Sequence, residues 1–134
     1  MRLITHNMMF CNVKACVATA NMESEEPKNF PLHITIAEGG IKQVPQEFSA
    51  EFVVGILPRI DWRALRATAA ELGIAALPEA LPESYATDVG FLKSVHTLIL
   101  EVHVTEGALV CGNCQRVYPI VKGIPNMLLN EDEV

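Results

Sequence analysis

The stretch LVCGNCQRVYPIVKGIPNMLL, residues 109–129, places two closely spaced cysteines directly before a run of large apolar residues. Cys111 and Cys114 form a C-x2-C pair, and Gly112 between them favours the tight turn that lets both thiolates reach one ion. The segment that follows contains Val117 and Pro119, which are poor helix formers. The stretch therefore predicts a metal-binding turn that leads into a strand. It leaves open whether the apolar run is core or a surface for another protein.

The other two cysteines, Cys11 and Cys16, form a C-x4-C pair at the opposite end of the chain. Together the two pairs supply the four thiolates of a tetrahedral zinc shell. A closed shell of this kind has no position for a catalytic water, so the predicted zinc is structural and pins the two ends of the chain together. His6 could replace a cysteine ligand, but with four thiolates present we expect it to have a structural hydrogen-bonding role or a surface role. The other histidines have no ligand-like spacing to an acid or a thiol and are predicted to be ordinary face residues: His33, His96 and His103.

The composition is that of one compact domain, or one domain with an insert. The 134 residues are 50% apolar and 19% charged, and the mean hydropathy of +0.26 is high enough to leave apolar surface for a partner. No apolar run approaches the roughly 20 residues that span a bilayer, and no secretory signal pattern is present. We therefore expect a cytoplasmic and nuclear location, where four cysteines favour a metal over disulfides. The net charge of −6 and the scattered basic residues argue against direct nucleic-acid binding.

Strands are predicted toward both ends of the chain. The polar residues 19–29 have no periodicity and predict a loop, whereas residues 32–36 alternate apolar and polar and predict a strand before the turn at Gly39 and Gly40. Strand alternation also begins at Leu100. Further features predicted beyond that point are a hairpin turn at Glu106-Gly107, a strand at residues 117–121 with Pro119 at an edge or bulge, and a turn at Lys122-Gly123.

The middle of the chain shows helical periodicity in three segments. The first has one predicted face made of Phe48, Phe52, Val53 and Ile56, and ends at Pro58. The second begins at the N-cap Asp61, ends at Gly73, and carries the stripe Trp62, Leu65, Ala69 and Leu72. The third begins at the N-cap Asp88 and carries Phe91, Leu92, Val95, Leu98 and Ile99. These segments predict a small helical insert.

Residue patterns typical of an active site are missing from the sequence. No G-x-S-x-G, P-loop, Rossmann glycine pattern or H-E-x-x-H occurs. A thiol redox enzyme needs its C-x2-C at the start of a helix, which the segment after Cys114 does not favour. The sequence therefore favours a zinc-stapled binding module over an enzyme.

Both ends of the chain resemble a known family, the eukaryotic multifunctional methyltransferase subunits. The resemblance rests on MRLITHNMMFCNVKAC at residues 1–16 and on HTLILEVHVTEGALVCGNCQRVYPIVKGIPNMLL at residues 96–129. Its most specific part is Tyr118-Pro119-Ile120 followed by Gly123-Ile124-Pro125-Asn126. In the middle, residues 48–52 and Ile60-Asp61-Trp62 also match, while residues 17–43 and 78–87 match poorly.

The resemblance implies an α+β fold, with a zinc-ribbon-like antiparallel sheet domain formed by both termini and an inserted small helical domain. We expect the zinc-binding domain at residues 1–44 plus 100–134 and the insert at residues 45–99. The family implies no methyl transfer by the chain itself. It implies heterodimers, one at a time, with several S-adenosylmethionine-dependent methyltransferases: tRNA guanosine and wobble-uridine types, a small-subunit rRNA guanine type, and a release factor glutamine type. The methyl donor then binds only to the partner, whose sheet is extended by strand addition.

The free energy of association sets a lower limit on the size of the partner surface. Burying Ile124, Met127, Leu128 and Leu129 contributes roughly 6 to 12 kcal/mol, against an association cost of about 4 to 15 kcal/mol. The C-terminal segment alone is insufficient, so we expect N-terminal apolar residues to share the surface. The predicted partner interface is Met8, Met9, Phe10, Ile124, Pro125, Asn126, Met127 and Leu128. Met127→Glu is expected to spare folding and break heterodimers, and Val117→Glu to damage the fold.

One alternative of a different class remains at this point. A zinc-ribbon module could bind RNA or belong to a transcription or translation complex. Salt-sensitive RNA binding by the isolated chain would favour it over the methyltransferase subunit.

Overall fold

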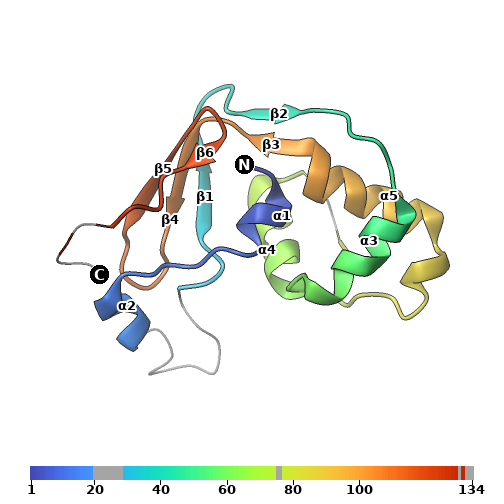
Figure 1. Cartoon of the computed structure of the whole chain (residues 1–134), viewed down its shortest axis with the longest axis horizontal. Coiled ribbons are helices and arrows are strands. Elements are labelled where there is room, and N and C mark those ends of the chain that lie inside the picture. Colours follow the sequence, from blue (N-terminus) through green and yellow to red (C-terminus); the bar gives the residue numbers. More distant parts are fainter. Residues whose placement is uncertain (20–28, 75–76, 130, 132–134) are drawn as a thin grey trace.

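The computed structural model describes residues 1–19, 29–74, 77–129 and 131, and Figure 1 shows its arrangement. Most of the predicted loop at residues 19–29 lies outside these ranges. The helices are α1 (Leu3–His6), α2 (Lys14–Thr19), α3 (Ala50–Ile56), α4 (Trp62–Leu72) and α5 (Val89–His96), with short helical segments η1 (Leu57–Arg59), η2 (Tyr85–Thr87) and η3 (Thr97–Glu101). The strands are β1 (His33–Ile36), β2 (Ile41–Gln43), β3 (Val102–Val104), β4 (Gly107–Val110), β5 (Val117–Val121) and β6 (Ile124–Pro125). Within this part of the chain no helix is long and apolar enough to cross a membrane.

Two antiparallel sheets lie beside the helices, which confirms the α+β class. The larger sheet has the strand order β1-β4-β5-β6, and the smaller one pairs β2 with β3. In Figure 1, α1, α3, α4 and α5 lie to the right of the larger sheet. β1 pairs with β4 from His33 opposite Val110 to Ile36 opposite Gly107, so strands from both ends of the sequence share one sheet.

The larger sheet contributes one face to the core. Its inward residues Ile34, Leu109, Tyr118 and Ile120 are buried. They belong to a single apolar cluster that also takes in Leu3 from α1, and residues of the helices such as Leu65, Ala69, Leu92 and Val95. This cluster runs through both predicted parts of the chain. The boundaries 1–44 plus 100–134 and 45–99 stay a prediction.

The caps predicted for two helices are confirmed. The Asp61 side chain accepts a hydrogen bond from the Ala64 amide at 2.9 Å at the start of α4, and Gly73 ends that helix in the left-handed conformation, at φ 66°. The Asp88 side chain accepts from the Phe91 amide at 3.0 Å at the start of α5. Short polar side chains at these positions satisfy amides that have no partner within the helix.

Two helical predictions were wrong in detail. Phe52 was placed on one helical face with Val53, but α3, which begins after the N-cap Ser49, buries Val53 and leaves Phe52 46% exposed. Phe48 precedes the helix, so its spacing to Phe52 has no helical meaning. The change to strand was predicted at Leu100, but η3 continues helically to Glu101 and buries Leu98, Ile99 and Leu100. A short, fully buried apolar run has no periodicity that separates helix from strand.

Two predictions about the strands were also wrong. Glu106-Gly107 is not a hairpin turn, because β3 pairs with β2 whereas β4 pairs with β1 and β5, so the chain passes there from one sheet to the other. Pro119 does not lie in an edge strand, because β5 lies between β4 and β6. The Pro119 carbonyl accepts from the Asn126 amide at 2.8 Å, on the side where β6 is only two residues long. A proline is tolerated there because little of the ladder on that side needs its missing N–H.

Candidate metal centre and partner surface

The four cysteines come together in one cluster, as predicted. Their Sγ atoms all lie within 4.8 Å of one another, with Cys11 and Cys114 at 3.7 Å and Cys16 and Cys111 at 3.6 Å. All four are free thiols, since a disulfide brings its sulfurs to about 2.05 Å. In the described part of the chain this is the one group of His, Cys, Asp or Glu side chains close enough to share a metal ion.

Three separate segments bring the thiols together. Cys11 lies beyond α1 and exchanges two hydrogen bonds with the buried Asn29: the Cys11 amide donates to the Asn29 carbonyl at 3.1 Å, and Asn29 Nδ2 donates back to the Cys11 carbonyl at 3.0 Å. Cys16 is carried by α2. Cys111 and Cys114 lie on the turn between β4 and β5, which Gln115 closes in the left-handed conformation at φ 64°.

Hydrogen bonds from neighbouring groups surround the sulfurs. The amides of Asn113 and Cys114 point at Cys111 Sγ from 3.3 and 3.5 Å. The Asn113 side chain donates to Cys16 Sγ at 3.1 Å, and the Tyr118 hydroxyl lies 2.9 Å from Cys11 Sγ. The sequence analysis did not identify Asn113 and Tyr118 as partners of the thiols. The one available signal was their position, since Asn113 lies between Cys111 and Cys114 and Tyr118 follows Cys114. Donors placed in this way stabilise negative charge on thiolates and orient them.

Burial governs the ionisation of these thiols when no metal is bound. Burial raises the pKa of the Cys16 thiol to about 12 and also raises the pKa of the Cys114 thiol. Burial acts in the same direction on Cys11, but hydrogen bonds, that of Tyr118 first, outweigh it and lower the pKa of the Cys11 thiol. At Cys16 and Cys114 the raised pKa favours neutral sulfur until a cation supplies positive charge.

The histidines have structural partners rather than a place in the cluster. Of the two roles predicted for His6, the structure confirms hydrogen bonding and not a surface position: His6 is 2% exposed, its Nε2 hydrogen-bonds the Leu32 carbonyl at 2.7 Å, and burial lowers its pKa. His33 and His96 were predicted to be ordinary face residues, which is correct for the exposed His33 and wrong for the buried His96. His33 lies 3.0 Å from Glu71, and the buried His96 lies 3.2 Å from Glu101. His96 is thus part of the helical packing and not a face residue.

The predicted partner interface is divided between exposed and half-buried side chains. Met8 is 49% exposed, Phe10 47%, Ile124 71% and Leu128 80%, and Asn126 is also exposed. Met9 and Met127 are half-buried and pack against the core, and Pro125 is half-buried. The C-terminal segment thus alternates, with Ile124 and Leu128 outward and Met127 inward. Contact of these residues with a partner stays a prediction.

The expectation for Val117 was wrong. Its side chain is 55% exposed, because β5 alternates and turns Tyr118 and Ile120 inward instead. Val121 is exposed to the same extent. A charge at Val117 is therefore not expected to damage the fold.

The C-x2-C turn leads into the strand β5 and not into a helix. Its thiols therefore lack the helix N-terminus that lowers the thiol pKa in redox sites of this type. Four clustered cysteines on an antiparallel sheet, with helices inserted between its strands, define a zinc-ribbon-like protein with a helical insert. A family model described as Trm112p-like protein matches residues 2–123. The chain belongs to this family.

Curated relatives match over their full lengths. "Multifunctional methyltransferase subunit trm112" of Schizosaccharomyces pombe is 44% identical over 135 residues, covering all of both chains. "Multifunctional methyltransferase subunit TRM112 homolog A" of Arabidopsis thaliana is 42% identical over 136 residues, again covering all of both. The corresponding protein of Mus musculus is 40% identical, over 99% of this chain and 98% of its own.

A solved structure has a similar fold. It is the E. cuniculi Mtq2-Trm112 complex, described as responsible for the methylation of the eRF1 translation termination factor. The matched chain has a TM-score of 0.52 at 14% identity, over 96% of this chain and 95% of that one. At this identity the similarity supports the fold alone.

Proposed function

We propose that the chain is a non-catalytic subunit that activates and stabilises several S-adenosylmethionine-dependent methyltransferases by forming heterodimers with them. The observation that carries this proposal is the full-length similarity to relatives named multifunctional methyltransferase subunits, at 44% and 42% identity. The exposed apolar side chains at Ile124 and Leu128 fit the proposal, since a subunit of this kind needs a surface for its partner.

The metal of the four-cysteine cluster is proposed to be Zn²⁺, one per chain. Four sulfurs placed about 2.3 Å from a tetrahedral zinc lie about 3.8 Å from one another. The 3.6 and 3.7 Å separations of the two closest pairs fit that shell. When bound, the zinc neutralises the thiolates and joins the segments that carry them. Cys11, Cys16, Cys111 and Cys114 fill all four positions, so the role is structural.

The proposed contact is strand addition at the free edge of the larger sheet. β6 pairs with β5 on one side, and no strand of the described residues pairs with its other side. Main-chain hydrogen bonds at such an edge do not depend on the partner's side chains, so one edge can serve several enzymes. The exposed Ile124 and Leu128 then add apolar contacts, together with Met8 and Phe10 from the N-terminal segment.

The proposed partners are the methyltransferase types that the family resemblance implies, acting on tRNA, on rRNA and on a release factor. One surface that serves them all makes the enzymes compete for the subunit. We also propose a cytoplasmic and nuclear location, where such enzymes meet their substrates.

Coexpression tests the proposal. An Mtq2-type release factor methyltransferase is expressed alone and with this chain, and its soluble yield and its affinity for S-adenosylmethionine are measured. We expect both to rise with the wild-type chain and to fall back with Leu128→Glu, but not with Phe52→Glu, an exposed apolar residue on α3. No effect of the wild-type chain on any of the proposed types of methyltransferase would sink the proposal.

A further inference from the structure

The larger sheet has two edges, and they differ in what lies against them. At β6 no strand of the described residues pairs with the outer side, and Ile124 is 71% exposed. At the other edge, β1 likewise has a single strand partner, β4. An edge strand presents unpaired N–H and C=O groups to which another strand can add, unless charged side chains or a covering helix block them. The contacts made by β1 therefore decide how many strands the sheet can accept.

Alternate residues of β1 direct their main-chain groups to its open side. The Ala37 amide donates to the Glu106 carbonyl at 3.0 Å, on the side of β4. In an antiparallel pair the N–H and C=O groups of successive residues point alternately to the two sides of the strand. Ile34 and Ile36 therefore face the open side, as does Leu32, which directly precedes the strand.

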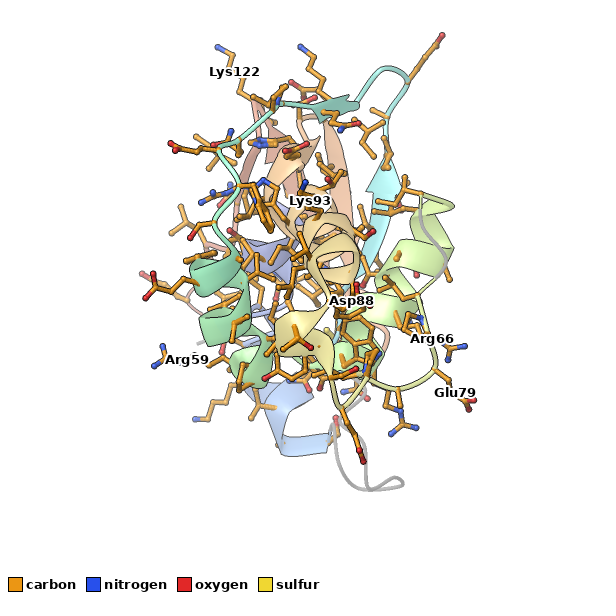
Figure 2. The ribbon with its side chains drawn as sticks, turned by 90° about the vertical axis from the view of Figure 1, so that its right-hand side faces the viewer. Arg59, Arg66, Glu79, Asp88, Lys93 and Lys122 are labelled. Atoms are coloured by element: carbon orange, nitrogen blue, oxygen red, sulfur yellow. The ribbon has the colours of Figure 1, made fainter. Side chains whose placement is uncertain are left out.

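Side chains from two helices already occupy these groups. Oε1 of Glu71 on α4 accepts from the Ile34 amide at 2.7 Å, and Nε2 of His6 on α1 donates to the Leu32 carbonyl at 2.7 Å. The second carboxylate oxygen of Glu71 lies 3.0 Å from Nδ1 of His33, which fixes the orientation of the carboxylate. Figure 2 shows α4 (light green) beside β1 (cyan). The open side of β1 is thus covered by hydrogen-bonded side chains.

The stability of α4 does not account for the place of Glu71. This residue lies in the last turn of the helix, which ends at Leu72. The macrodipole leaves partial negative charge at a helix C-terminus, so a carboxylate there is unfavourable and a basic residue would be favourable. α4 has no basic residue in its last turn. The contact with β1 is therefore what the carboxylate contributes.

We infer that Glu71 is a specificity-determining residue that closes the β1 edge, so that a second copy of this chain cannot pair there and an added strand has only β6 to join in the larger sheet. The part that concerns a methyltransferase strand rests on the proposed function, whereas closure against a second copy does not. An open β1 edge could pair with β1 of a second copy across a two-fold axis, with Ile34 opposite Ile36. One open edge gives one added strand per chain.

Two substitutions of Glu71 test the inference. Glu71→Ala removes both oxygens, whereas Glu71→Gln keeps one that can accept from the Ile34 amide. Glu79→Ala is the control, at an exposed acid that extends outward in Figure 2. Hydrogen exchange of the Ile34 amide is followed by NMR, and self-association by sedimentation equilibrium, on the full chain with zinc present.

We expect the Ile34 amide of Glu71→Ala to exchange at least about 10-fold faster than that of the wild type, and this variant to self-associate at least about 10-fold more tightly, since one main-chain hydrogen bond contributes about that factor. Glu71→Gln and Glu79→Ala should stay within about threefold of the wild type. Unchanged exchange in Glu71→Ala, or faster exchange without tighter self-association, would overturn the inference. Should Glu71→Ala misfold, scalar coupling across the hydrogen bond from the Ile34 amide to the Glu71 carboxyl carbon is measured in the wild type, and its absence overturns the inference.

Binding to a methyltransferase separates this inference from the proposed function. Folded Glu71→Ala is expected to bind a coexpressed Mtq2-type methyltransferase within about threefold of the wild-type affinity, because the β6 edge is unchanged. Loss of binding in this variant would put the partner strand at β1 and overturn the inference, while the proposed function stands. If the wild type binds no methyltransferase, the proposed function fails, and exchange and self-association still decide whether Glu71 closes β1.

Discussion

At the scale of single residues, Tyr118 connects the core to the metal centre. It is completely buried, its hydroxyl hydrogen-bonds Cys11, and the Arg116 guanidinium lies 5.1 Å from its ring centroid. Arg116 in turn donates from Nη2 to the Leu128 carbonyl at 3.0 Å. One tyrosine thus touches a metal ligand and, through Arg116, the segment proposed for the partner.

Tyr118→Phe is expected to weaken zinc binding about 10- to 100-fold, since partners of a metal ligand usually contribute that much. The substitution removes the hydroxyl that stabilises Cys11 and leaves the packed ring in place. Competition with a chromophoric chelator measures the affinity. Tyr85→Phe is the control, at the one other tyrosine of the chain. Equal zinc affinity in wild type and Tyr118→Phe would show that the hydroxyl has no role at the metal.

The metal ligands were predictable from the sequence because their spacing is characteristic, whereas the hydrogen bonds around them were not. Two close cysteine pairs predict a shared ion, and the structure brings all four sulfurs together. The hydrogen bonds of Tyr118 and Asn113 depend instead on how three distant segments approach one another. Cys11 and Tyr118 are separated by 107 positions, and no local pattern encodes their contact.

At the scale of the element, the alternation of side chains along β5 decides which residues are buried and which are exposed. The sequence predicts this strand correctly but not its inward face, because both sets of side chains are apolar. Helix caps were more informative: Asp61, Gly73 and Asp88 act over one turn of chain, so their effect is independent of distant packing. The π-helical η3 and the exposed Phe52 depend on burial by other elements, which one sequence does not reveal.

Ile120→Ala is expected to lower the free energy of unfolding by about 2 to 5 kcal/mol, because Ile120 is 1% exposed. Val117→Ala, three positions earlier on the opposite face of β5, should change it by less than about 0.5 kcal/mol. Urea unfolding with zinc present throughout measures both. Equal destabilisation by the two substitutions would mean that β5 does not hold the orientation described.

At the scale of the whole molecule, the metal centre joins segments that are remote in sequence. Cys16 and Cys111 are 95 positions apart. A second set of contacts also joins the N-terminal residues to the C-terminal part of the chain. The Met1 amino group donates to the Val104 carbonyl at 2.8 Å and to the Gly123 carbonyl at 2.6 Å. Burial, followed by the charge of Arg2, lowers the pKa of this amino group.

Removal of the zinc is expected to destabilise the cysteine-bearing segments more than the helices α4 and α5. Cys111→Ser, or exhaustive chelation of the wild type, removes folding free energy on the order of 10 kcal/mol from the cysteine-bearing segments. Hydrogen exchange should then accelerate in residues 7–16 and in β4 and β5, while α4 and α5 keep more of their protection. Ser94→Ala, a substitution on α5 away from the cluster, is the control. Unchanged exchange in a zinc-free Cys111→Ser chain would show that the centre is dispensable for the fold.

The 95 positions between Cys16 and Cys111 also have a consequence for synthesis. At about 5 to 20 residues per second, a ribosome needs roughly 5 to 20 seconds to add the segment between them. During that interval Cys11 and Cys16 have been synthesised, but Cys111 and Cys114, the other two ligands, have not. The strand β1 likewise has no partner until β4 is synthesised. The helices α3 and α4 are complete earlier. The proposed ion can therefore be held by four ligands only after Cys114 has been synthesised, which makes metal loading a late step in the folding of each molecule.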